Sequence, residues 1–307
     1  MKQKLLTVVK LSSKVREYVE QFYDILTQDQ LNDSNVGEIE VIMSDGTGIV
    51  HKDLLDRLPN VKLIDNFGVG YDGVDVEECR KRDIAICTTP GVLTDDVADL
   101  ALAFILNLGR GVASAQRFLE SGKWRRGFRN GLATKVTGKN LGIIGLGRIG
   151  SAVARRAAAF DMKIYYYDEF VTNDSYVKCD SLTDLASKVE FLVICAAATP
   201  ENHNIVDEDV INALGRKGYL INVARGSLVD EEVLADYVKR GLIKGAALDV
   251  FVHEPKVPKP FRGRDNVIVT PHIASATRET RAKMAEIVIG NLKAFREGTE
   301  YLTRLKL

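Results

Sequence analysis

Short runs of β-branched and aliphatic residues alternate with amphipathic stretches along most of the chain. Nine such runs begin with EVIMS at residues 40–44 and end with NVIVTP at residues 266–271, and MKQKLLTVVKL at the N-terminus predicts a further strand. This alternation is typical of α/β proteins, in which helices cover parallel sheets and ligands bind at the loops after the strands. Those loops are therefore where functional residues are expected.

The predicted strands form two successive series. The first series ends at IAICTTPG, residues 84–91, and the second ends at NVIVTP. Residues 278–298 have the periodicity of an amphipathic helix that no strand follows, so we expect this helix to return to the first domain. The pattern predicts a discontinuous first domain, residues 1–93 and 281–307, and a second domain, residues 94–280. A length of 307 residues also favours two domains.

The charge balance excludes two classes of partner. Lys and Arg number 42, as do Asp and Glu, so the formal net charge is zero. Nucleic acids and anionic membranes attract strongly basic surfaces, and we therefore expect neither as a partner. The most apolar stretch, residues 100–108, is shorter than the roughly 20 residues of a membrane-spanning helix. The N-terminus lacks the features of a signal peptide, which predicts a cytoplasmic location.

The four cysteines are scattered along the chain without a C-x-x-C pair. This spacing favours reduced core thiols over a disulfide framework or a zinc site, and we expect no bound metal. The four residues are Cys79, Cys87, Cys179 and Cys195.

A glycine-rich turn follows the strand NLGII. Gly145, Gly147 and Gly150 lie between this strand and an alanine-rich helix. In a dinucleotide-binding turn the first glycine permits the tight turn, the second lets a pyrophosphate approach, and the third allows close packing of helix on strand. The surrounding strand and helix make this interpretation stronger than a purely structural glycine turn.

The next strand, KIYYYD, ends at Asp168, at the distance expected for an acidic residue that binds a ribose. A carboxylate accepts hydrogen bonds from both ribose hydroxyls, whereas a 2′-phosphate would meet the charges of Asp168 and Glu169. Neither Arg nor Lys occurs in the next several residues. The pattern predicts NAD over NADP, and a solvated charge at the strand end is the alternative.

Only four histidines could act as the general acid or base. His51 begins a surface helix pattern, His203 lies in a polar loop, and His253 precedes Glu254 in extended chain, where neighbouring side chains point apart. His272 follows a strand, in the sequence TPHIAS, and is the best candidate. A structural histidine is the alternative.

Two further residues in post-strand loops complete a possible site for reducing a ketone. Glu254 could favour the protonated form of His272 and orient its ring. Arg225, in INVARGSLVD, could hold a substrate carboxylate or polarise a carbonyl group with its planar guanidinium. Alone, each residue is as readily explained as a solvated loop charge. Together with His272 they occupy three successive post-strand loops.

The chain resembles the D-isomer-specific 2-hydroxyacid dehydrogenases along almost its whole length, most closely the glyoxylate, hydroxypyruvate and hydroxyphenylpyruvate reductases. The resemblance is carried by NFGVGYDGVD, TTPGVLTDDVADLALAFIL, GLGRIG, ATPENHN, NVARGSLVDEEVL, GAALDVFVHEP and TPHIAS. It implies two doubly wound parallel-sheet domains, a Rossmann cofactor domain and a flavodoxin-like substrate domain, with the active site in a hinged cleft. It also implies reduction of a small 2-keto acid to the D-2-hydroxy acid with NAD(P)H, and a homodimer formed through the cofactor domain.

The resemblance assigns residue roles. Arg225 would bind and orient substrate, Glu254 would partner His272, and His272 would donate the proton in reduction. The backbone N–H groups of Val69 and Gly70 would hold the substrate carboxylate. Cofactor contacts are implied for Arg148 and Ile149 at the pyrophosphate, Val223 at the adenine or nicotinamide side, Asp249 at the nicotinamide end, and Thr199 in the loop that closes on the cofactor.

Some features depart from the family pattern or leave the substrate open. Asp168 stands where NADPH-using relatives tend to have a small or basic residue, alanine replaces a frequent proline before Thr199, and His203 replaces a usual threonine.

The identity of the substrate stays open. Asp45, in the loop MSDGTG near the expected cleft, stands where an enzyme for a phosphorylated substrate would need a cation, so 3-phosphoglycerate is disfavoured. Glyoxylate, hydroxypyruvate, 4-hydroxyphenylpyruvate and 2-ketogluconate all remain possible substrates. Trp124 and Phe128 could border the site or a subunit contact, although core packing is the favoured interpretation of Trp124.

Two other functions stay open. Some relatives are NAD-sensing transcriptional corepressors that resemble the dehydrogenases even at the positions of Arg225, Glu254 and His272. A formate dehydrogenase is disfavoured by Glu254, because that branch lacks the carboxylate partner of the histidine.

Overall fold

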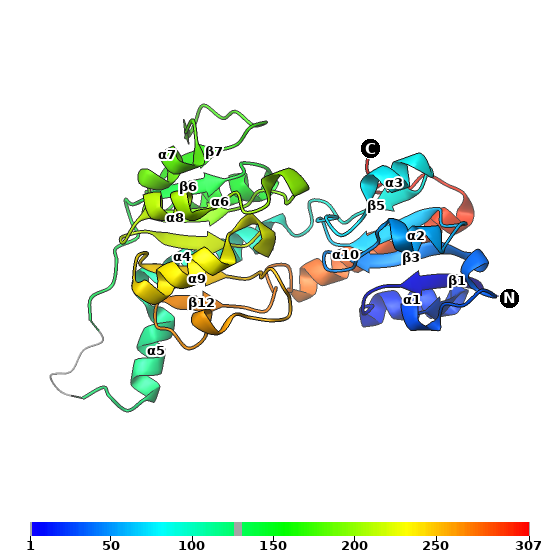
Figure 1. The fold of residues 1–307 in the computed structure, drawn as a ribbon, viewed down its shortest axis with the longest axis horizontal. Helices are drawn as coiled ribbons and strands as arrows, with labels where there is room; N and C mark the ends of the chain where they lie inside the picture. The colour runs from blue at the N-terminus through cyan, green and yellow to red at the C-terminus, as the bar shows by residue number, and fades with distance from the viewer. Residues whose placement is uncertain (1, 126–130, 307) are drawn as a thin grey trace. The chain divides into compact units, whose positions relative to one another are not determined.

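The computed structural model describes residues 2–125 and 131–306 and divides into two compact units (Figure 1). The first unit comprises Met1–Leu93 and Ala276–Leu307, and the second comprises Thr94–Ser275. The predicted boundary at residues 280 and 281 falls inside the first turn of helix α10, Arg278–Glu297, whose N-cap is Thr277. The whole of α10 therefore belongs to the first unit.

The first unit is built on a parallel sheet of five strands in the order β2-β1-β3-β4-β5. This is the strand order of a flavodoxin-like doubly wound sheet, as predicted. The strands are β1 (Gln3–Thr7), β2 (Tyr23–Leu26), β3 (Ile39–Asp45), β4 (Leu63–Phe67) and β5 (Ala85–Cys87). The helices are α1 (Ser13–Phe22), α2 (Lys52–Asp56), α3 (Val76–Lys81) and α10, with 3₁₀ turns at Gln28–Gln30 and Val36–Glu38.

Alternate residues of these strands enter two separate cores. Leu63 packs with buried side chains of α1 and α10, whereas its neighbour Ile64 packs with Leu55 and Cys79 from α2 and α3. Successive strand side chains point to opposite faces, so a continuous apolar run fills both cores. This explains why the central parts of β1 and β3, at Leu5 and Leu6 and at residues 41–43, are continuous apolar runs.

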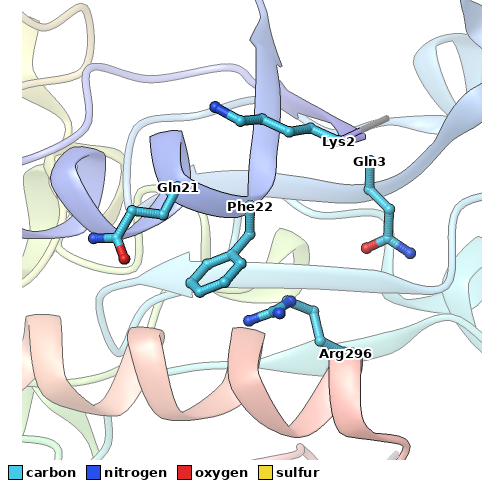
Figure 2. Close-up of a pocket in the computed structure, with 5 residues that line it drawn as sticks. All are labelled: Lys2, Gln3, Gln21, Phe22 and Arg296. Carbon is cyan, nitrogen blue, oxygen red and sulfur yellow. The ribbon is translucent and has the colours of Figure 1, made fainter.

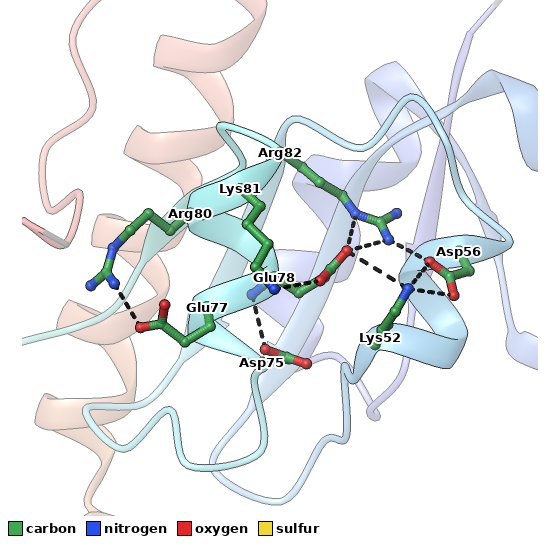
Figure 3. A network of polar contacts seen from close by, with 8 residues as sticks. All are labelled: Lys52, Asp56, Asp75, Glu77, Glu78, Arg80, Lys81 and Arg82. Atoms are coloured by element: carbon green, nitrogen blue, oxygen red, sulfur yellow. Dashed lines mark hydrogen bonds and ion pairs between the residues drawn. The ribbon is translucent and has the colours of Figure 1, made fainter.

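An ion-pair network joins α2 to α3 (Figure 3). The guanidinium of Arg82 bonds Asp56 of α2, the carboxylate of Glu78 in α3 and the Leu55 carbonyl oxygen. The hydrogen bond from Arg82 lowers the pKa of Glu78. The network fixes the two short helices against each other on one face of the sheet.

The second unit has a parallel sheet of seven strands in the order β12-β11-β10-β9-β6-β7-β8. Its central order is that of the Rossmann fold, with the change of winding direction between β6 and β9, where ligands bind. The strands are β6 (Asn140–Ile144), β7 (Lys163–Tyr167), β8 (Val177–Lys178), β9 (Phe191–Ile194), β10 (Tyr219–Asn222), β11 (Gly245–Leu248) and β12 (Val267–Val269).

Helices cover both faces of this sheet. The helices are α4 (Thr94–Arg110), α5 (Val112–Glu120), α6 (Arg148–Ala158), α7 (Leu182–Ser187), α8 (Glu208–Leu214) and α9 (Glu231–Arg240), with 3₁₀ turns at Pro200–Asn202, Gly226–Leu228 and Lys259–Phe261. Helices α4 and α6 pack together on one face, and α7 and α8 pack together against the core of the other. The predicted fold class, two doubly wound parallel α/β sheets, is confirmed.

Two features differ from the sequence predictions. The edge strand β2, with the sequence YDIL, is too short and too polar to stand out as a strand. Trp124 is 70% exposed, so the prediction that it packs in a core is wrong. Phe128 lies outside the described residues. The predicted homodimer stays a prediction.

Across residues 2–125 and 131–306, no single helix has the length and apolar character needed to cross a membrane. Only α4 and α5 taken together meet that test by length and composition, with a bend of 58° between them.

Candidate active site

The glycine-rich turn between β6 and α6 leaves an open surface at the N-terminus of the helix. Gly145 has a φ of +87°, and a Cβ there would lie 2.6 Å from the Ala196 backbone. A Cβ at Gly150 would lie 2.0 Å from the Gly145 carbonyl oxygen, whereas at Gly147, the N-cap of α6, it would meet no atom within 4 Å. Close packing at two glycines and open space at the third suit a turn that a pyrophosphate approaches.

Asp168 follows β7 and is tied to this turn. Its Oδ2 accepts a hydrogen bond of 2.7 Å from the Leu146 N–H, and its Oδ1 accepts from the N–H groups of Phe170 and Val171. Each carboxylate oxygen can accept more than one hydrogen bond, so capacity for ribose hydroxyls remains. Lys178, ten residues later, donates to the Val171 carbonyl oxygen at 3.4 Å. The structure thus brings a cation to this loop that was not evident from the residues next to Asp168.

A buried asparagine shapes the loop that carries Arg225. Asn222, at the end of β10, donates to the Arg225 carbonyl oxygen at 2.8 Å and accepts from the Ala224 N–H at 3.0 Å. Asn222 is 1% exposed, so these bonds form away from water. The Arg225 guanidinium is half-buried and donates to the Ala224 carbonyl oxygen.

The loop after β12 is held by Asp249, which follows β11. The Asp249 carboxylate accepts hydrogen bonds from the Thr270 hydroxyl and from the N–H groups of Ile273 and Ala274, and its carbonyl oxygen accepts from the His272 N–H. His272 has a φ of +53°, a left-handed conformation that is uncommon outside glycine and needs such support. The Asp249 side chain is fully buried, and its predicted contact with the nicotinamide stays a prediction.

Glu254 and His272 lie in direct contact. The His272 Nδ1 is 2.9 Å from the Glu254 Oε2, and both side chains are partly exposed. Burial would raise the pKa of Glu254, but the hydrogen bond and charge of His272, the Phe251 N–H and the charge of Arg225 together lower it. The carboxylate is therefore charged at neutral pH, a form that its contact with His272 and the charge of Arg225 favour. Because β10, β11 and β12 are neighbours in the sheet, their loops bring these three residues together.

The remaining cofactor candidates lie at the same edge of this sheet. Arg148 and Thr199 are exposed, Ile149 is partly buried at the start of α6, and Val223 is buried at the end of β10. These positions place Arg148 and Ile149 beside the open surface at Gly147. No group of three or more metal-ligating side chains occurs within the described ranges.

The loop after β4 in the first unit offers two backbone donors. The buried Asn66 side chain donates to the carbonyl oxygens of Gly68 and Gly70, and the Thr89 N–H donates to Gly68. Among the residues that the structure describes, the N–H groups of Val69 and Gly70 have no acceptor. The carbonyl oxygens of Gly68 and Gly70 are fixed by hydrogen bonds, and the N–H groups of Val69 and Gly70 are available to donate to a ligand.

Two surface hollows lie elsewhere in the first unit. One, of about 570 Å³, is lined by Lys2, Gln3, Gln21, Phe22 and Arg296 (Figure 2). The other, of about 710 Å³, lies between α3 and the C-terminal segment that includes Tyr301 and Arg304. Gln3 begins β1, so the first hollow lies at the amino edge of the sheet, away from the edge where Val69 follows β4. Neither hollow contains a candidate residue.

Comparison with known proteins decides the family. The model of the D-isomer specific 2-hydroxyacid dehydrogenase, NAD binding domain, matches residues 102–274. The chain belongs to the D-isomer specific 2-hydroxyacid dehydrogenase family. The matched residues fall within the second unit, which contains the glycine turn and the His272 and Glu254 pair.

Relatives in this dehydrogenase family align with nearly the whole chain. Glyoxylate/hydroxypyruvate reductase A of Arabidopsis thaliana is 39% identical over 306 residues, which cover 97% of each protein. Hydroxyphenylpyruvate reductase of Plectranthus scutellarioides is 43% identical over 267 residues, 86% of this chain and 85% of the relative. The crystal structure of an NADPH-dependent glyoxylate/hydroxypyruvate reductase from Sinorhizobium meliloti, in complex with NADP and malonate, matches with a TM-score of 0.92 and 35% identity, covering 99% and 97% of the two chains.

Sequence reasoning missed how buried polar residues shape the dehydrogenase loops. Asn66 and Asn222 are not singled out by the sequence, and Asp249 is predicted only as a cofactor contact. All three are buried polar residues at or near the ends of strands, where an apolar residue would suit the core better. A polar residue that ends an apolar strand is the signal that could have identified them. Their partners are mostly backbone groups, which sequence patterns do not place.

Proposed function

We propose that this family member reduces small 2-keto acids of the glyoxylate and hydroxypyruvate class to D-2-hydroxy acids with NAD(P)H. The contact of 2.9 Å between His272 and Glu254, at the ends of neighbouring strands and near Arg225, carries the proposal. Relatives with these reductase activities, at 35–39% identity over almost the whole chain, support the substrate class.

Arg225 binds the substrate in this proposal. The planar guanidinium of Arg225 hydrogen-bonds the carboxylate and keto oxygens of a 2-keto acid, a pairing that its two parallel donors match. For the N–H groups of Val69 and Gly70, in the first unit, we propose binding of a carboxylate ligand. The Glu254 carboxylate contacts the Nδ1 of His272 and so orients the ring.

His272 moves the proton. Its Nδ1 is bonded to Glu254, which leaves Nε2 as the ring nitrogen that donates a proton to the keto oxygen. When bound, NAD(P)H supplies the hydride to the carbonyl carbon, and the glycine turn, Arg148 and Ile149 hold its pyrophosphate while Asp168 holds a ribose. In the oxidation direction the neutral ring of His272 accepts the proton of the hydroxyl group.

The first prediction concerns the two residues that touch substrate. In spectrophotometric assays with 2-keto acids and NADH or NADPH, we expect H272A to lower kcat by about 10²- to 10⁴-fold, as for loss of one positioned acid. R225K should mainly weaken use of substrate, because an ammonium group cannot reproduce the bidentate contact. H203A, which removes an exposed histidine, is the matched control. Wild-type kcat in H272A on the best substrate would exclude the proton-transfer role.

The panel of substrates also tests the substrate class. It includes glyoxylate, hydroxypyruvate, 4-hydroxyphenylpyruvate and 2-ketogluconate. A kcat/KM highest for glyoxylate or hydroxypyruvate supports the proposal, and absence of turnover with every 2-keto acid and either cofactor contradicts it.

We further propose that NAD is preferred over NADP. The Asp168 carboxylate, with Glu169 beside it, would repel a 2′-phosphate, and the ammonium group of Lys178 is directed to Val171 and Thr172. We expect a higher kcat/KM with NADH than with NADPH, and a smaller ratio in D168N, which removes the charge. K178Q tests whether that lysine contributes to any NADPH use. Equal or better turnover of the wild type with NADPH would refute the preference.

A further inference from the structure

The turn that carries Glu254 is held by a second glutamate. Glu231, the first residue of α9, accepts a hydrogen bond of 3.1 Å from the Val252 N–H through its Oε1. The adjacent Phe251 N–H donates to the Oε1 of Glu254 at 3.2 Å. Two consecutive backbone donors of one turn are therefore fixed by two different carboxylates.

The backbone of Gly226 also packs closely against this turn. A Cβ at Gly226 would lie 2.1 Å from the Phe251 carbonyl carbon and 2.3 Å from the Val252 nitrogen. Gly226 directly follows Arg225, so the Arg225 loop packs against the turn with no room for a side chain. The turn is thus held by two contacts, one with the Gly226 backbone and one with the Glu231 carboxylate.

Within residues 2–125 and 131–306, no hydrogen bond links Glu231 to the ring of His272 or to the carboxylate of Glu254. Its side chain is half-buried, and burial raises its pKa, whereas the Val252 N–H and the charge of His253 act to lower it. What the turn needs from this side chain is a hydrogen-bond acceptor. A glutamine offers the same acceptor without the charge.

We infer that Glu231 is a positioning residue, which holds the Phe251–Glu254 turn so that the Glu254 carboxylate stays in contact with His272. This inference builds on the proposed function, since it concerns the same histidine and carboxylate. A displaced carboxylate would leave the His272 ring without its partner, and even small misplacement of catalytic groups lowers rates markedly.

The chain provides a matched control in Glu232. It follows Glu231 in the first turn of α9, so both carboxylates meet the same helix dipole, but Glu232 is exposed. E231A and E232A therefore remove the same charge from the same helix end. Only E231A removes the acceptor of the Val252 N–H.

The first test follows the titration of His272 by NMR in protein labelled at histidine, without substrate or cofactor. The signal is assigned by its loss in H272A among the four histidines. We expect the titration midpoint of His272 in E231A to move toward that of E254Q, and to stay at the wild-type position in E231Q and E232A. An unchanged midpoint in E231A would overturn the inference. This readout does not depend on turnover, so it is separate from any failure of the proposed function.

The second test is a double-mutant cycle on kcat. We expect E231A to lower kcat about tenfold with little change in the KM for cofactor, and E231Q to restore most of the loss. In the E254Q background E231A should add almost nothing, because residues that act through one another are not additive. Full additivity of E231A and E254Q would show that Glu231 acts independently of Glu254 and would overturn the inference. An equal loss in E232A would overturn it too, because the charge at the start of α9, and not the contact with Val252, would then be responsible.

Discussion

Gly147 and Gly150 lie three residues apart in one turn, yet an added methyl group would meet different surroundings at each. At Gly150 it would overlap the Gly145 carbonyl oxygen, which belongs to the backbone of the same turn. At Gly147, where φ is −66°, it would project into open space. Gly150 is therefore required for the turn to pack, whereas Gly147 leaves space for a ligand to approach the helix.

We therefore predict opposite effects of alanine at the two positions. G150A should destabilise the protein, since backbone atoms cannot move aside easily, and a lower Tm by calorimetry measures this. G147A should keep a Tm near that of the wild type but raise the Kd for NADH, measured by fluorescence titration, because the methyl group occupies the space of the pyrophosphate. Unchanged NADH affinity in well-folded G147A would contradict this use of the turn.

Single residues also show what the sequence could and could not predict. Arg225, Glu254 and His272 were predicted from their places after strands, and the contact between the last two was expected from the chemistry of a general acid. Their supports were not predicted, because Glu231 acts on the Val252 N–H and Asp249 acts on backbone groups of the His272 loop. Backbone donors are the same at every residue, so only the folded loop reveals which of them is bound.

At the scale of elements, the order of strands explains why the candidate residues meet. Arg225, Glu254 and His272 are far apart in the sequence, but β10, β11 and β12 are neighbours and parallel, so the loops after them share one edge. The alternation of strand and helix patterns predicted this arrangement. The edge strand β2 escaped prediction, because its four residues include an exposed aspartate and no long apolar run.

The elements of the first unit are joined by a buried polar network. Asn291 of α10 donates to the Oδ1 of Asp65 in β4 and to the Thr303 hydroxyl, which in turn donates to the Thr88 carbonyl oxygen. The Leu302 N–H donates to the Asn291 side chain. The network attaches the last helix and the C-terminal segment to the sheet, which explains physically why the chain's end belongs to the first unit.

At the scale of the whole molecule, Asp65 makes stability depend on pH. Its carboxyl group is fully buried, and its Oδ2 has no hydrogen-bond partner among the described residues. Burial raises its pKa to about 8, although the hydrogen bond from Asn291 acts in the opposite direction. In the unfolded chain an aspartate has a pKa of about 3.9. Between these two values the folded protein keeps a proton that the unfolded chain releases.

The sign of the effect follows from this difference in bound protons. The unfolded state binds fewer protons than the folded state between about pH 4 and pH 8. The free energy of unfolding contributed by Asp65 should therefore fall as pH rises through this window, by about 1.4 kcal/mol per pH unit at most. Below the window both states are protonated, and above it both are ionised.

Replacing Asp65 with asparagine should remove this dependence. D65N keeps an acceptor for the Asn291 side chain and carries no charge, so we expect it to match the wild type near pH 4 and to exceed its stability increasingly toward pH 8. Urea unfolding followed by circular dichroism at several pH values measures the difference, in which other titrating groups cancel. D24N, which alters an exposed aspartate on the edge strand β2 of the same sheet, should leave the wild-type slope unchanged. Parallel curves for D65N and the wild type would mean that Asp65 is ionised in the folded protein, and that the network around Asn291 holds a buried carboxylate.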